Sequence, residues 1–177
     1  MTNTPSPSAV PATIPVAGGS VSSHVVNGIG RIAFQHPKGN SLPGALLREL
    51  AATITRVAAD PAARVLLLSS GGSGAFCAGA SFDELSRIET PEAGHEFFSG
   101  FAGVILAMIR APQFVLTRVH GRAAGGAVGL IAASKLSFAV SGASAKLSEL
   151  AVGIGPFVVG PVIEKKIGLA AFSAMAS

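Results

Sequence analysis

Apolar residues follow helical spacing in one long segment near the middle of the first half of the chain. There they recur every three or four positions, at Leu42, Leu46, Leu50, Ile54 and Val57. This spacing predicts an amphipathic helix, with Ser41 as a candidate N-cap and Asp60 and Pro61 as its end.

Other apolar runs are continuous or short, as in strands. Residues 64–70 and 113–121 are apolar without alternation, which predicts strands covered on both faces of a sheet. Two short apolar runs flank Asn27 and Gly28, a dipeptide that favours a type I′ hairpin turn. Further strands are predicted at 135–140 and 145–150. Further helices are predicted at 81–89, 91–110 and 123–134 and over most of the remainder to Ser177.

Strands that alternate with helices predict an α/β fold in a single domain. The chain has 177 residues, enough for one full core. Residues 1–20 are rich in Pro, Ser and Thr and lack periodicity, so we expect a disordered tail there and the folded domain over 21–177.

Composition narrows the possible partners and the compartment. Hydrophobic residues make up 49% of the chain and charged residues only 12%, which fits a tightly packed homo-oligomer. The net charge of +4 is scattered along the chain, so we do not expect a nucleic-acid partner. Cys77 is the only cysteine, which excludes an internal disulfide and favours a reducing compartment. The sequence has no run long enough for a membrane span and no signal-peptide pattern at its start, so the prediction is a cytoplasmic protein.

Two glycine-rich loops, each between a predicted strand and a predicted helix, are the candidate sites of chemistry. The first loop covers residues 71–80 (GGSGAFCAGA) and the second loop covers residues 121–126 (GRAAGG). Each can present free backbone N–H groups at a helix N-terminus, where negative charge is favoured. An anion or a developing oxyanion would fit such a place.

Three local hypotheses compete at the second loop. A phosphate-binding Walker A loop is excluded because Ala127 and Val128 stand where Lys and Ser or Thr are required. A dinucleotide-binding fingerprint stays open: Ala124 replaces its first glycine, but Glu149 follows at about the distance of a ribose-binding acid. The glycines could also serve only close packing between helices.

Three motifs together resemble the enoyl-CoA hydratase/isomerase, or crotonase, superfamily. They are GAFCAGASFDEL at 74–85, VHGRAAGGAVGLIAAS at 119–134 and KLSELAVGIGPF at 146–157. The resemblance runs from about Val25 to the end of the chain. It implies a crotonase-like spiral of ββα units, an acyl-CoA thioester as substrate, no cofactor apart from the coenzyme A of the substrate, and assembly into trimers or dimers of trimers.

The resemblance also implies roles for individual residues. The N–H groups of Ala80 and Gly126 would form an oxyanion hole for the thioester oxygen, with Ala78, Gly79 and Gly125 beside them in the two loops. Glu149 matches a catalytic glutamate of the family, and Ser148 replaces the proline that often precedes it.

Two further positions concern the substrate. Family hydratases carry another glutamate at the position of Gly129, where this chain has none. Gly129 would leave room for a packed neighbour or for a bulky acyl group. Lys38 lies where family members place basic residues near the phosphates of CoA.

The resemblance implies hydration or isomerisation of an enoyl-CoA. A single acid favours the isomerase type, which needs one base that moves a proton between two carbons, or a weaker or different hydratase. The alternative is a catalytically silent CoA-binding or assembly subunit. Family chains continue beyond the position of Ser177 with further helices, so the expectation is a C-terminally shortened chain whose activity is open.

The four histidines lack the spacing of metal ligands, and no metal site is expected. The sequence contains no Gly-x-Ser-x-Gly motif, so serine hydrolase chemistry is not expected.

Overall fold

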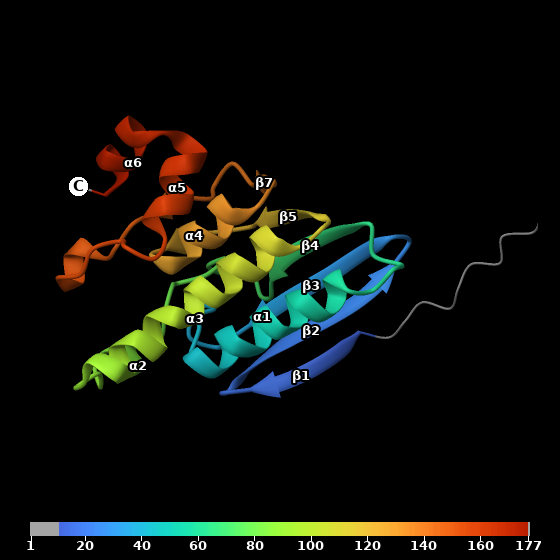
Figure 1. Cartoon of the computed structure of the whole chain (residues 1–177), viewed down its shortest axis with the longest axis horizontal. Helices are drawn as coiled ribbons and strands as arrows, with labels where there is room; N and C mark the ends of the chain where they lie inside the picture. The colour runs from blue at the N-terminus through green and yellow to red at the C-terminus, as the bar shows by residue number, and fades with distance from the viewer. Residues whose placement is uncertain (1–10, 177) are drawn as a thin grey trace, which may run out of the picture.

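The computed structural model describes residues 11–176, and a six-stranded sheet forms its centre (Figure 1). The strand order is β1-β2-β3-β4-β5-β7. These strands span Ala12–Val16, Gly19–Val26, Ile29–Gln35, Val65–Ser70, Phe114–Val119 and Leu136–Ala139. The first three are antiparallel neighbours, and β3, β4, β5 and β7 run parallel. The sequence prediction of an α/β fold is therefore confirmed.

The long helices lie on one face of this sheet (Figure 1). Helix α1 spans Gly44–Ala58 and α3 spans Pro91–Arg110, and the two pack against each other. Parallel strands that follow one another in sheet order, joined by right-handed crossovers, place each connecting helix on the same side. Helices α4 (Gly126–Ala133), α5 (Gly160–Ile167) and α6 (Leu169–Met175) continue from this layer. The described residues contain no helix that is long and apolar enough to cross a membrane.

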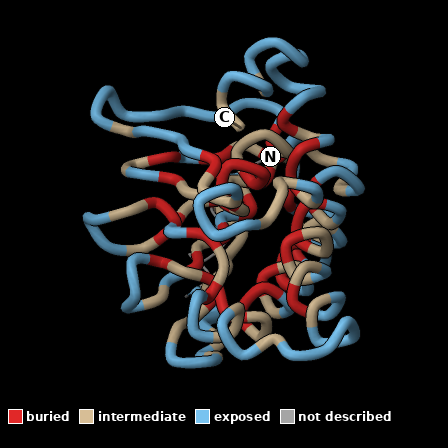
Figure 2. Tube along the Cα trace, turned by 90° about the vertical axis from the view of Figure 1, so that its left-hand side faces the viewer, coloured by how far each residue is buried: buried red, intermediate tan, exposed pale blue. Residues whose placement is uncertain are grey.

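The core lies between the sheet and these helices, as the buried segments in Figure 2 indicate. Leu46, Leu50 and Ile54 of α1 are almost fully buried there, which confirms the predicted apolar stripe. On β4, Leu66 and Leu68 are buried, whereas the alternate positions 65, 67 and 69 are only half-buried. The prediction that this strand is covered on both faces is therefore wrong, because all the crossover helices pack on one side.

The first twenty residues were predicted as a tail, and this boundary is wrong for the part that is described. Strand β1 pairs antiparallel with β2 through a turn at Ala17 and Gly18, both with positive φ. Pro15 is tolerated because β1 is an edge strand. Pairing with β2 and contact with α1 stabilise this segment as a strand, although its composition is typical of a disordered tail. Residues 1–10 of the predicted tail lie outside the described residues.

Two local predictions near the start of the chain have different outcomes. The hairpin at Asn27 and Gly28 is confirmed, since both residues have positive φ between β2 and β3. The predicted N-cap at Ser41 is wrong: α1 begins at Gly44, and the N–H of Gly44 donates to Glu84 Oε2 at 2.8 Å. Glu84 belongs to the short helix α2 (Phe82–Leu85), so a side chain distant in sequence occupies the helix start.

Candidate active site

Four chain segments lie side by side where the parallel strands end, and they build the candidate site. They comprise residues 39–42, the end of the first loop, the end of the second loop and residues 144–149. Strand β6 (Ala123–Ala124) pairs parallel with β8 (Ala145–Lys146), and isolated bridges join Leu42 to Ala80 and Cys77 to Ala123. The two glycine loops, far apart in sequence, are thus hydrogen-bonded neighbours.

Backbone hydrogen bonds set the distance between these segments. Cys77 N donates to Arg122 O at 3.2 Å, and Ala124 N donates to Cys77 O at 3.0 Å. Gly125 N donates to Lys146 O at 2.9 Å, so the second loop is held from its other side as well. Close packing is part of this arrangement, because a β-carbon on Gly79 would lie only 2.8 Å from Ala124 O.

The N–H groups of Ala80 and Gly126 donate no hydrogen bond within the described part of the chain. In the bridge to Leu42, Leu42 N donates to Gly79 O, and Ser81 N donates to Leu42 O. The N–H of Ala80, which lies between these two residues, therefore faces away from Leu42. Gly126 is the first residue of α4, where a helix leaves its N–H groups free. Gly125 precedes it with φ 54° and ψ −125°, a conformation that favours glycine.

Ala80 and Gly126 both line a cavity of about 820 Å³. Ala78, Gly79, Gly125 and Glu149 line the same cavity. The structure therefore brings six of the predicted site residues together around one space. Two other predicted residues, Lys38 and Gly129, are not among its lining residues.

Glu149 has a fixed and a free carboxylate oxygen. Its Oε2 accepts a hydrogen bond from Ser148 N at 2.9 Å. Its Oε1 lies 3.5 Å from the place that a β-carbon on Gly125 would occupy, so the carboxylate lies against the second loop. Among the described residues that line the cavity, Glu149 is the only one with a charged side chain.

Gly129 is buried one turn into α4, beneath the wall of the cavity. A β-carbon there would lie 2.5 Å from Val159 Cγ1 and 3.1 Å from Ile105 Cδ1. Of the two reasons predicted for this glycine, room for a neighbouring side chain is thus the observed one, and room for an acyl group is not.

Lys38 lies on the turn beside the first loop, where Ala78 N donates to Gly39 O at 3.1 Å. The exposed Lys38 ammonium pairs with the carboxylate of Asp83 on α2. This hydrogen bond and the lysine charge lower the pKa of Asp83 below its ordinary value. Phe82, the residue before Asp83, lines the cavity, so Lys38 lies near the rim of the cavity.

Sequence reasoning missed two sets of residues that shape the site. Asn40 joins the turn to the first loop, since its Nδ2 donates to Gly71 O and to Ala75 O, each at 2.9 Å. Three phenylalanines of α3, at positions 97, 98 and 101, line the cavity. Their helical spacing shows in the sequence, but it does not distinguish a cavity wall from an ordinary core.

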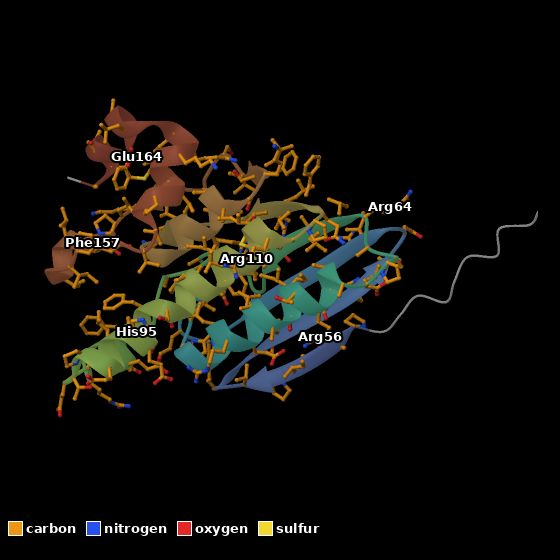
Figure 3. The ribbon with its side chains drawn as sticks, viewed as in Figure 1. Arg56, Arg64, His95, Arg110, Phe157 and Glu164 are labelled. Carbon is orange, nitrogen blue, oxygen red and sulfur yellow. The ribbon has the colours of Figure 1, made fainter. Side chains whose placement is uncertain are left out.

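Another wall of the cavity is the segment 151–159, which begins within the 3₁₀ turn Leu150–Val152. Phe157 projects from this segment in Figure 3 and is 85% exposed. Elsewhere in residues 11–176, no three His, Cys, Asp or Glu side chains gather as metal ligands would.

Comparisons with known proteins agree on one family. A family model described as enoyl-CoA hydratase/isomerase matches residues 24–177. The enoyl-CoA hydratase domain-containing protein 2, mitochondrial, of Homo sapiens is 32% identical over 130 residues, 73% of this chain and 44% of that protein. The methylglutaconyl-CoA hydratase, mitochondrial, of Rattus norvegicus is 31% identical over 117 residues, 66% of this chain and 37% of that protein.

A solved structure supports the same fold. The enoyl-CoA hydratase of Mycobacterium smegmatis superposes with a TM-score of 0.83 at 27% identity, and the match covers 88% of this chain and 61% of that chain. The chain thus spans less than half the length of those two sequence relatives and about three fifths of this structural one. The likeness confirms the predicted crotonase-like fold.

Proposed function

The chain belongs to the enoyl-CoA hydratase/isomerase family, and we propose that it binds an acyl-CoA thioester and moves a proton within its acyl group. The observation that carries this proposal is the pair of N–H groups on Ala80 and Gly126. They have no acceptor among the described residues, and they line one cavity with Glu149, the single carboxylate of its described lining. The dinucleotide-binding alternative gains no support from this family membership.

The proposed chemistry begins at the thioester oxygen. When a proton leaves the carbon next to the thioester carbonyl, the electron pair of that C–H bond moves towards the carbonyl oxygen and creates an enolate. The N–H groups of Ala80 and Gly126 would donate to that oxygen. Preorganised donors of this kind contribute about 10² to 10³ each to the rate. Gly126 also opens α4, and the helix dipole favours negative charge at that end.

Glu149 would carry the proton. Because Ser148 N holds Oε2, Oε1 is the oxygen left to accept a proton from one carbon and return it to another. This single acid favours double-bond isomerisation of an enoyl-CoA. Hydration is the second reaction class, since family hydratases use a second carboxylate at the position that Gly129 fills here.

Lys38 is proposed to bind a phosphate of the CoA portion at the rim of the cavity. Its ammonium group pairs with Asp83 on the surface, and solvent screening makes exposed pairs of this kind contribute little to stability. A phosphate could therefore replace Asp83 as the partner at little cost.

The central test is Glu149→Gln, which keeps the shape of the side chain and removes its basicity. We expect turnover of 3-enoyl-CoA or 2-enoyl-CoA substrates to fall at least about 100-fold, the contribution of a general acid or base. Glu164→Gln, on the exposed surface of α5 (Figure 3), is the matched control and should leave turnover unchanged. Equal turnover of the Glu149→Gln protein and the wild type would remove Glu149 from the mechanism.

A silent CoA-binding subunit is the second candidate, and the filled space at Gly129 favours it. Calorimetry with coenzyme A separates the two. Binding of CoA together with no turnover on any enoyl-CoA would support the silent subunit, whereas turnover that depends on Glu149 would exclude it.

A further inference from the structure

We propose that three phenylalanines of α3 select an uncharged, apolar acyl group, an inference that rests on the acyl-CoA function proposed above. The aromatic wall is defined as Phe97, Phe98 and Phe101, all of which line the cavity. Phe97 and Phe101 lie one helical turn apart and therefore share one face of α3.

The aromatic wall is packed into the protein. Phe97 is 9% exposed and Phe101 is 5% exposed, so most of each ring has left the solvent. The rings of Phe97 and Phe98 meet edge to face, with centroids 5.2 Å apart and planes at 87°. Such pairs hold both rings in defined orientations, which gives the wall a fixed shape.

This wall lies next to the proposed oxyanion hole. A β-carbon on Gly126 would lie 2.7 Å from Cε1 and Cζ of the Phe101 ring, so this ring packs directly on the residue that carries one donor. Gly100 lets α3 approach α1, because a β-carbon there would lie 2.8 Å from Leu47 Cδ1. An acyl chain that leaves a carbonyl bound at Gly126 would therefore meet an aromatic surface.

The charges around the cavity exclude an acidic acyl group. No Lys, Arg or His belongs to the described residues that line it, and Glu149 is the only carboxylate. A second carboxylate, carried by the acyl chain, would lose its hydration in the cavity and find no cationic partner there. Glu149 would also repel it. A cationic acyl group would pair with Glu149 and so occupy the proposed base. The geometry thus points to an acyl group that is apolar along its length.

Binding to a matched pair of thioesters tests this inference without requiring turnover. The probes are trans-2-hexenoyl-CoA and its analogue with a carboxylate in place of the terminal methyl group, with coenzyme A alone as the reference. Calorimetry should show the hexenoyl thioester binding roughly 100-fold more tightly than the acidic analogue.

Variants of the wall test the residues themselves. Phe98→Leu should weaken the binding of trans-cinnamoyl-CoA about tenfold, because edge-to-face and stacking contacts with the ring are lost. Phe138→Leu, the same change at a 59% exposed residue of β7 away from the cavity, should leave that binding unchanged. Phe98→Arg should reverse the preference and favour the acidic analogue, and circular dichroism would verify that each variant is folded.

The outcomes distinguish this inference from the proposed function. If coenzyme A binds but the acidic thioester binds as tightly as the hexenoyl thioester, the acyl selectivity is wrong and the CoA function stands. Equal loss of cinnamoyl-CoA binding in Phe98→Leu and Phe138→Leu would show that the aromatic wall does not determine acyl specificity. If neither coenzyme A nor any thioester binds, the proposed function fails and the inference with it.

Discussion

Gly129 shows how one residue limits the chemistry of the site. Val159 Cγ1 and Ile105 Cδ1 occupy the space into which any side chain at this position would extend. Overpacking of a filled core typically costs about 1 to 3 kcal/mol. A glutamate at this position would therefore need several neighbours to move, and Glu149 is the only acid among the described residues that line the cavity.

Cys77 is a second residue whose surroundings decide its chemistry. It is completely buried between the two loops, and this burial raises the pKa of its thiol from 9.0 to about 12. The thiol accepts a hydrogen bond from Gly79 N at 3.4 Å, which packs it into the first loop. A neutral buried thiol is inert, so Cys77 has a packing role between the two loops.

The raised pKa of Cys77 predicts a loss of stability at high pH. Between pH 9 and pH 12 the thiol ionises in the unfolded chain and stays neutral in the folded chain. The unfolded state then binds fewer protons, so the free energy of unfolding should fall by up to about 1.4 kcal/mol per pH unit through this group. Urea titrations from pH 8.5 to 10.5 measure this slope.

Cys77→Ala is the control for that measurement, because it retains every other ionisable group. Its free energy of unfolding should decline less steeply with pH than that of the wild type. Parallel slopes in the two proteins, or rapid reaction of the native thiol with a thiol reagent at pH 8, would contradict the neutral buried state.

At the scale of elements, the first loop depends on a turn that lies outside it. Asn40 is 5% exposed and has φ 57°, and its side chain makes three hydrogen bonds at 2.9 Å. It accepts one from His36 N and donates the other two to Gly71 O and Ala75 O. These bonds attach the turn before α1 to the segment that ends at Ala80.

Asn40→Asp should loosen this attachment, because a carboxylate cannot donate to Gly71 O and Ala75 O. Leaving buried carbonyl groups without donors costs about 1 to 3 kcal/mol, which urea unfolding measures. Asn27→Asp is the matched control: Asn27 also has positive φ, in the exposed hairpin turn, and its replacement should change stability by less than about 0.5 kcal/mol. Equal effects at the two positions would show that Asn40 does not hold the loop.

At the scale of the whole molecule, one edge of the sheet is apolar and exposed. Leu136 and Phe138 of β7 and the following Val140 are 57%, 59% and 50% exposed. An exposed apolar edge strand is prone to pair with another chain. This edge agrees with the assembly into trimers or dimers of trimers that the family resemblance implies, which stays a prediction.

Sedimentation analysis tests that assembly. We expect a mass three or six times that of the 17.6 kDa chain. Phe138→Lys should shift the protein towards monomer, because a charge would enter the apolar edge. Thr13→Lys places the same charge on β1 at the opposite edge of the sheet and should leave the mass unchanged. A monomeric wild type would contradict the prediction.

Local sequence determined the features that depend on near neighbours. The stripe of α1, the hairpin at Asn27 and Gly28 and the two glycine loops all follow from periodicity and backbone preference. The family resemblance pointed to Ala80, Gly126 and Glu149, which line one cavity in the structure. Their proposed roles depend on that arrangement and on the experiments described above.

Tertiary structure alone decided the features that depend on distant segments. Strand β1 exists because β2 pairs with it, although its own sequence resembles a tail. The start of α1 is capped by Glu84, and Gly129 faces Val159, thirty positions further along the chain. Contacts of this kind leave no periodic trace in the sequence, because each partner is chosen by how the sheet and helices pack and not by its neighbours along the chain.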